Sequence, residues 1–183
     1  MKGNKALTKA AGVVSLATFS SRILGFIRDM IIAKVFGAGM VTDAFFIGFR
    51  IPNMLRELLA EGALTAAFVP TFTYYLKNKG QNEAWNLANK VSNLLFLILL
   101  AVTGAGLIFT PSIVQVIAPG FTASVDKFAL NVSLTRIMFP YIMLIGLAAL
   151  CMGILNSMGH FAMPALSPTI FNLSIILSVV FLH

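Results

Sequence analysis

Residues 91–109 read VSNLLFLILLAVTGAGLIF, and this stretch decides the fold class of the chain. It contains no charged side chain, and its 19 residues, almost all apolar, reach the length of roughly 18 residues that indicates a transmembrane helix. Asp, Glu, Lys and Arg are absent from the whole of residues 91–125 and again from residues 137–183. We therefore predict that both regions lie largely in lipid, where a charge is costly.

The composition of the whole chain gives the same prediction. Hydrophobic residues make up 58% of the 183 residues, charged residues only 10%, and the mean hydropathy is +0.92. A soluble domain has about 25% charged residues. A very hydrophobic soluble core is the weaker alternative, because several apolar runs are long enough to cross a bilayer.

The apolar runs predict an all-α polytopic transmembrane helix bundle of about five helices. The expected spans are residues 10–35, 41–76, 91–109, 128–155 and 164–183, within one transmembrane domain over residues 1–183. The second span is longer than a hydrocarbon core of about 30 Å requires, so we expect it to tilt or to bend at Pro52 and Pro70. Pro140 is expected to bend the fourth span. A partly helical polar connection is expected at residues 77–90, and a loop at residues 110–126.

Basic residues predict the orientation in the membrane. They gather at the N-terminus and in the second connection, at Lys2, Lys5, Lys9, Lys77, Lys79 and Lys90. Because short cytoplasmic loops carry an excess of Lys and Arg, the N-terminus is predicted to be cytoplasmic. The sequence stops within an apolar run, so we expect a longer transporter to continue it.

Charged residues inside the first two spans are the candidate functional site. The first span carries Arg22, Arg28, Asp29 and Lys34, and the second carries Asp43, Arg50, Arg56, Glu57 and Glu61. Each charge at membrane depth costs about 2.5–3.5 kcal/mol on insertion scales, so it needs a partner or water. Spacings of seven residues, about two helical turns, place Arg22 with Asp29 on one face and Asp43, Arg50 and Glu57 on another.

Two interpretations of these charges remain open. The charges could pair with one another and only lock the bundle, or they could line a solvated cavity that binds an anionic substrate. Five cations against four acids in the two spans favour the cavity. Arginine also suits phosphate, because its planar fork of N–H donors matches phosphate oxygens. Asp43 and Glu61, near the span ends, could act as gate latches.

No acid–base pair, metal-ligand cluster or nucleotide-binding loop stands out in the sequence, so we predict neither an enzyme nor a cofactor. A transporter remains the main hypothesis. The alternatives are an oligosaccharide-lipid flippase, a cation-coupled drug antiporter and a non-transporting scaffold for cell-wall assembly. A drug antiporter should have a cavity dominated by acids, and a scaffold has no need of unpaired arginines.

Several stretches resemble one family in the same order along the chain. They are FSSRILGFIRD at 19–29, VFGAGMVTDAFF at 35–46, RIPNMLRELLAEGALTAAF at 50–68, APGFTASVDKFAL at 118–130, FPYIML at 139–144 and PALSPTIFN at 164–172. Together they resemble the start of the MurJ/MviN lipid II flippases of the MOP exporter superfamily. The resemblance implies two lobes of transmembrane helices around a central cationic cavity, with this chain in the N-terminal lobe.

The resemblance also implies a substrate and a set of site residues. The substrate is lipid II, the undecaprenyl-diphosphate-linked peptidoglycan precursor, which moves from the cytoplasmic to the periplasmic leaflet by alternating access. Substrate-binding positions correspond to Arg22, Arg28, Asp29, Arg50 and Arg56. Gating or ion-pair positions correspond to Asp43, Glu57 and Glu61.

Overall fold

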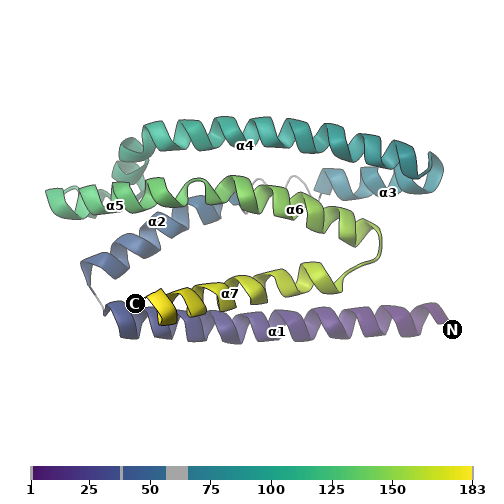
Figure 1. Ribbon diagram of the computed structural model, residues 1–183, viewed down its shortest axis with the longest axis horizontal. Coiled ribbons are helices and arrows are strands. Elements are labelled where there is room, and N and C mark those ends of the chain that lie inside the picture. The colour runs from purple at the N-terminus through teal and green to yellow at the C-terminus, as the bar shows by residue number, and fades with distance from the viewer. Residues whose placement is uncertain (1, 38, 57–65, 183) are drawn as a thin grey trace. The chain divides into compact units, whose positions relative to one another are not determined.

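The fold is helical throughout the part of the chain that the computed structural model describes, residues 2–37, 39–56 and 66–182. The side chains of residues 2–11, 51, 52, 55, 56 and 182 are outside the description. Within these limits the elements are α1 (Lys2–Phe36), α2 (Met40–Arg56), α3 (Val69–Asn78), α4 (Gln81–Ile117), the 3-10 turn η2 (Pro119–Phe121), α5 (Val125–Met138), α6 (Tyr141–Ser157) and α7 (Ala162–Leu182) (Figure 1). The predicted all-α membrane class is confirmed.

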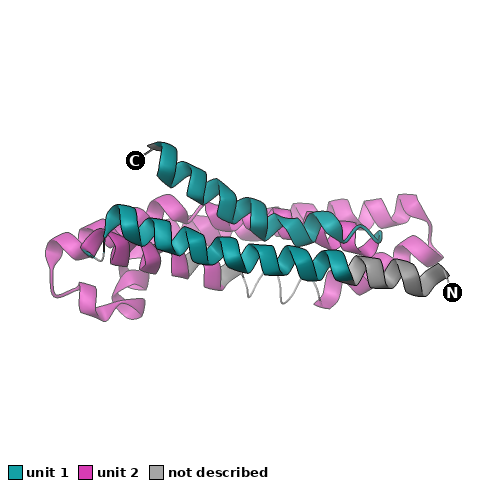
Figure 2. Ribbon diagram, turned by 90° about the horizontal axis from the view of Figure 1, so that it is seen from below, with its two compact units in different colours: residues 1–39, 158–183 teal, residues 40–157 magenta. Residues whose placement is uncertain are grey.

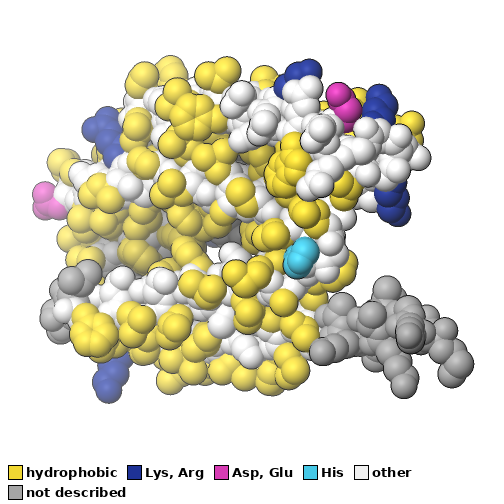
Figure 3. All heavy atoms as spheres, turned by 45° about the vertical axis from the view of Figure 1, so that its right-hand side comes forward, with side chains coloured by type: hydrophobic (Ala, Val, Ile, Leu, Met, Phe, Trp, Pro, Cys, Tyr) yellow, Lys and Arg dark blue, Asp and Glu magenta, His cyan; other side chains and the backbone are white. Residues whose placement is uncertain are grey.

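Three segments of the described chain are long and apolar enough to cross a membrane. They are Gln81–Ile117, Val125–Ser157 and Ala162–Phe181. Large apolar side chains are also exposed on α1, where Leu16, Phe19 and Phe26 are each at least 65% exposed. The face drawn in Figure 3 is covered mainly by hydrophobic side chains, as contact with lipid requires. That the first two expected spans cross the membrane stays a prediction.

The chain divides into two compact units (Figure 2). The first consists of residues 1–39 and 158–183, in which α1 packs against α7. The second consists of residues 40–157, in which α2 packs on α5, and α4 packs on α3, α5 and α6. The expectation of one transmembrane domain over residues 1–183 stays a prediction.

The expected polar connection at residues 77–90 is shorter than the sequence suggested. Helix α3 ends at Asn78 and α4 begins at Gln81, so only two residues separate them. Gly80 has φ 90°, a conformation that glycine adopts without a Cβ penalty, and it allows the sharp reversal. The first turns of α4 are helical because Ala84 and Ala88 are buried against Phe72 of α3.

The expected loop at residues 110–126 is wrong for its first half, since α4 continues through Pro111 to Ile117. Proline has no N–H, so the carbonyl of Leu107, four residues earlier, loses its helical partner. The Thr110 hydroxyl donates to the Gly106 carbonyl and also lies 3.3 Å from the Leu107 oxygen. The short bond goes to Gly106, so the Leu107 carbonyl gains only a weak contact, and α4 continues through the proline with that backbone bond missing.

The expected bend at Pro140 is confirmed, because α5 ends at Met138 and α6 begins at Tyr141. The backbone N–H of Phe139 still donates to the Thr135 carbonyl at 2.9 Å, so the helix breaks only after this residue. The Phe139 ring is 1% exposed and belongs to a core cluster with Leu99, Val114 and Ile142. The kink thus turns an aromatic side chain into the centre of the second unit.

Candidate functional site

Arg28 of α1 lies at the centre of a polar cluster in the first unit. Its Nε donates to Asp29 Oδ1 at 2.9 Å, and its Nη2 lies 2.8 Å from the same oxygen. Its Nη1 donates at 2.8 Å to the side-chain oxygen of Asn172 on α7. The Arg28 side chain is 20% exposed and that of Asp29 is 49% exposed. The guanidinium is therefore held from two helices while part of it stays accessible.

Asn172 connects Arg28 to the backbone of α1. Its amide nitrogen donates to the Ser21 carbonyl at 2.9 Å and lies 3.4 Å from the Ser21 hydroxyl. Asn172 is buried, with 7% of its surface exposed. A Cβ placed on Gly25 would lie 3.5 Å from the same amide nitrogen, an ordinary van der Waals contact, so the amide lies directly beside α1 at this position.

The cluster leaves Arg28 able to bind another anion. A guanidinium has five N–H donors, and three of those of Arg28 face the oxygens of Asp29 and Asn172. Two N–H groups, one on each Nη, remain for an acceptor outside the described contacts. An oxygen of a phosphate or diphosphate is suited to this position, since its charge strengthens the hydrogen bond.

The other two cations in residues 12–36 of α1, Arg22 and Lys34, make no ion pair with any described residue. Arg22 and Lys34 are both exposed. Because α1 is one continuous helix, the seven-residue spacing keeps Arg22 and Asp29 on one face, and the ion pair of Asp29 is with the adjacent Arg28. Residues 12–36 of α1 carry three cations and one acid, a net charge of +2. An anion near this helix would therefore be attracted by more than Arg28 alone.

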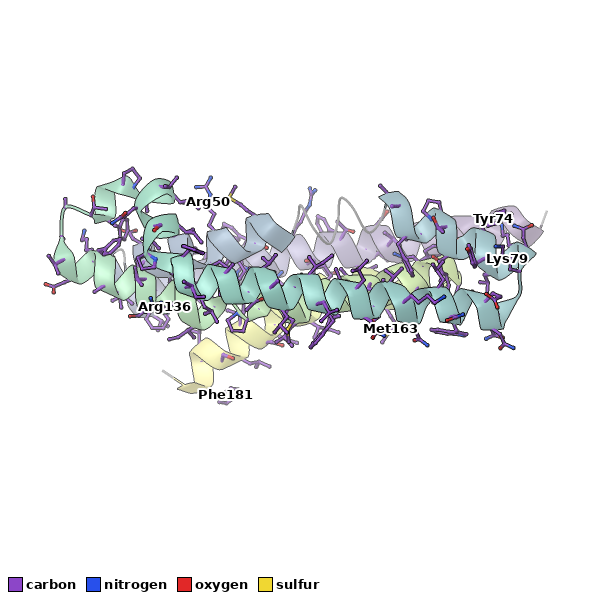
Figure 4. All side chains as sticks on the ribbon, turned by 90° about the horizontal axis from the view of Figure 1, so that it is seen from above. Arg50, Tyr74, Lys79, Arg136, Met163 and Phe181 are labelled. Atoms are coloured by element: carbon purple, nitrogen blue, oxygen red, sulfur yellow. The ribbon has the colours of Figure 1, made fainter. Side chains whose placement is uncertain are left out.

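In the second unit, the predicted site residues of α2 are exposed where the structure describes them. Asp43 lies in the first turn of α2, where a negative charge stabilises the positive end of the helix dipole. The Arg50 side chain extends away from the ribbon of α2 (Figure 4). The side chain of Arg56, and both Glu57 and Glu61, lie outside the described residues. That the charges of the two spans share one cavity stays a prediction.

Sequence reasoning missed the buried polar residues of α5. Asn131 and Thr135 have no exposed surface. The Asn131 amide donates to the Ala44 carbonyl of α2 at 3.3 Å, and the Thr135 hydroxyl donates to the Asn131 side-chain oxygen at 3.3 Å. A Cβ on Gly48 would lie 3.2 Å from the Thr135 hydroxyl. An asparagine within an apolar run was the available signal, because buried amides in membranes need interhelical partners.

Among the described residues, no group of three or more His, Cys, Asp and Glu side chains is placed so that it could hold a metal ion. The polar cluster and the apolar helices together define a polytopic α-helical membrane protein with a guanidinium held between two of its helices. Such a group is suited to an anionic ligand rather than to covalent catalysis.

Comparison with known proteins identifies the family. A family model described as "Lipid II flippase MurJ" matches residues 32–183. The chain is 46% identical over 168 residues to the probable lipid II flippase MurJ of Buchnera aphidicola subsp. Acyrthosiphon pisum (strain APS), covering 92% of this chain and 33% of that protein. It is 39% identical over 175 residues to the lipid II flippase MurJ of Burkholderia cenocepacia, covering 96% and 34%. The chain belongs to the MurJ lipid II flippase family.

A solved structure agrees with this assignment. The structure titled "Lipid II flippase MurJ, inward closed conformation" matches with a TM-score of 0.73 and 37% identity, covering 91% of this chain and 35% of that one. The chain thus spans about a third of the length of the relatives that it matches. The predicted resemblance to the family is confirmed.

Proposed function

We propose that this chain forms helices of the N-terminal lobe of a lipid II flippase. Such a flippase moves the undecaprenyl-diphosphate-linked precursor from the cytoplasmic to the periplasmic leaflet. The observation that carries the proposal is Arg28, a part-buried guanidinium held between α1 and α7 with two N–H groups still available. Relatives at 38–46% identity bear the name of this activity. The protein is proposed to act as a transporter, not as an enzyme.

The diphosphate of the substrate is the group that Arg28 would bind. Each phosphate offers oxygens that can accept from the free Nη hydrogens, while the polyprenyl tail stays in lipid. Arg22, Arg50 and Arg56 would add positive charge along the path, and Asp29 would orient the Arg28 guanidinium. Because Asp29 cancels only one of the three cations in residues 12–36 of α1, this part of the helix keeps a net attraction for an anion.

Opening toward alternate sides of the membrane would move the bound headgroup. Asp43, Glu57 and Glu61 are proposed to form ion pairs in one state and release them in the other. With the N-terminus in the cytoplasm and an inside-negative potential, each net negative charge carried outward gains about 2.3 kcal/mol per 100 mV. The potential could therefore supply direction without nucleotide hydrolysis.

A chimaera tests this function directly. Residues 1–183 would replace the corresponding third of the full-length Burkholderia cenocepacia flippase, and lipid II translocation would be measured in vesicles and by the growth of cells depleted of their own flippase. We expect the chimaera to translocate lipid II. Arg28→Ala should reduce lipid II binding by about 10- to 100-fold, since a hydrogen bond to a charged group contributes about 1.5–3 kcal/mol.

The matched control is Arg136→Ala, which removes an exposed arginine of α5 that has no place in the proposed site. It should leave translocation unchanged. A folded chimaera that does not translocate lipid II would contradict the proposed function. Unimpaired translocation by Arg28→Ala would remove Arg28 from the mechanism.

A further inference from the structure

We propose that Asn172 of α7 is a positioning residue that aims the Arg28 guanidinium at the substrate diphosphate. The inference rests on the proposed function, since it concerns the same site. Asn172 is 144 residues from Arg28 in sequence, and its side-chain oxygen accepts from Arg28 Nη1 at 2.8 Å. It does not itself need to touch the substrate.

Arg28 needs a second anchor because its first one is local. Asp29 is the next residue of the same helix, and it contacts Arg28 through a single carboxylate oxygen, Oδ1. One oxygen fixes the Nε and Nη2 side of the guanidinium but leaves Nη1 unheld. Asn172 supplies the missing contact from another helix. With both contacts present, the free N–H groups point in one defined direction before substrate arrives, which reduces the entropy lost on binding.

The amide of Asn172 is itself fixed in the required orientation. Its nitrogen donates to the Ser21 carbonyl at 2.9 Å, so its oxygen must face the guanidinium. A flipped amide would set its N–H groups against those of Arg28 and leave the carbonyl oxygen against the Ser21 oxygen. Gly25 leaves room for the amide between the helices, and burial of Asn172 excludes competing water. The network of Ser21, Asn172 and Arg28 therefore has a single satisfied arrangement.

A simple role in joining α1 to α7 is separable from this one. Thr169, one turn earlier on α7, donates from its hydroxyl to the Ala17 carbonyl at 3.3 Å and makes no hydrogen bond to a charged side chain among the described residues. Thr169→Val removes that interhelical bond while preserving shape. It is therefore the matched control for Asn172→Ala, because both remove a polar bond between the same two helices and only one removes a bond to Arg28.

The test is a double-mutant cycle on lipid II binding to the purified chimaera, with melting temperature measured in parallel. Asn172→Ala should weaken binding about tenfold, which is about 1.4 kcal/mol. Asn172→Leu, which fills the volume with apolar atoms, should weaken it equally and guards against a loss of folding. In an Arg28→Ala background neither change should weaken binding further, because the residue acts through Arg28. Thr169→Val should lower only the melting temperature.

The outcomes separate this inference from the proposed function. If the unsubstituted chimaera binds no lipid II, both the proposed function and the positioning role of Asn172 are contradicted. If it binds and Arg28→Ala weakens binding while both Asn172 variants bind like Thr169→Val, only the positioning role is overturned. The positioning role is also overturned if the Asn172 variants weaken lipid II binding by the same factor with and without Arg28, because their effect would then not pass through Arg28.

Discussion

Gly106→Ala is the substitution whose effect the structure defines most sharply. Gly106 is buried on α4, where it faces the ring of Phe139 at the kink between α5 and α6. A Cβ added at this position would overlap Cε1, Cζ and Cδ1 of Phe139. Real Cβ contacts are not this short, so the ring or the helix must move.

The magnitude follows from what surrounds the ring. Phe139 is 1% exposed and packed among Leu99, Val114 and Ile142, so it has no free volume to enter. Overpacking of this kind costs about 1–3 kcal/mol, and the upper end applies to so close an approach. Alanine recovers about 1 kcal/mol of helix propensity over glycine. The net destabilisation is about 2 kcal/mol, which lowers the melting temperature of a chain of this size by about 4–8 °C.

A control variant is available two residues away on the same helix. Gly104 has nothing within 4 Å of an added Cβ, so Gly104→Ala should gain the propensity term alone and melt at or above the unsubstituted protein. Thermal unfolding of the detergent-solubilised chain measures both variants. Adding Phe139→Leu to Gly106→Ala should cost less than the two changes summed, because the smaller side chain relieves the clash.

The refuting result is a Gly106→Ala protein that melts no lower than Gly104→Ala. The α4 backbone would then not lie against the Phe139 ring, and the packing of α4 on the kink would be incorrect. If the destabilisation of the double variant equals the sum of the two single destabilisations, the two residues are likewise not in contact.

Two further predictions concern helix packing in the second unit. Gly146→Ala should destabilise the protein less than Gly106→Ala, by under about 1 kcal/mol. The added Cβ meets Leu99 Cδ1 at 2.6 Å, and this atom is the end of a flexible side chain that can rotate. Melting temperatures of the two variants in one detergent measure the order, and the reverse order would contradict the prediction. Asn131→Ala should lower the free energy of unfolding by about 1 kcal/mol, because it removes the hydrogen bond to the Ala44 carbonyl and the acceptor of the Thr135 hydroxyl. The control is Asn93→Ala, an exposed change on α4, which should melt like the unsubstituted protein.

Much of the fold could be predicted because lipid imposes a local requirement. Every backbone polar group in the hydrocarbon must be satisfied within its own segment, so a long apolar run such as residues 91–109 indicates a helix wherever it occurs. The bend at Pro140 was predictable for a similar reason, since the missing N–H is a property of the residue itself. Family membership was also visible in the sequence, through ordered motifs spread over the chain.

The errors in the sequence prediction have non-local or side-chain causes. Pro111 was expected to end a helix, but α4 continues through it to Ile117 with one backbone bond missing. The helical part of residues 77–90 is larger than expected, since α4 begins at Gln81, where Ala84 and Ala88 pack with Phe72 of α3. Helical spacing placed Arg22 and Asp29 on one face of α1, but it did not predict that Asp29 pairs with the adjacent Arg28.

The amino-acid sequence by itself determined that this protein is helical, that it belongs in a membrane and that Arg28 is a functional candidate, because hydropathy and the cost of a charge in lipid act on each segment separately. Only the tertiary structure decided that Asp29 and Asn172 hold the Arg28 guanidinium, and that Asn131 joins α2 to α5. These contacts depend on which helices pack together and in what register. That choice arises from side-chain packing between segments as many as 144 residues apart, which no local pattern encodes.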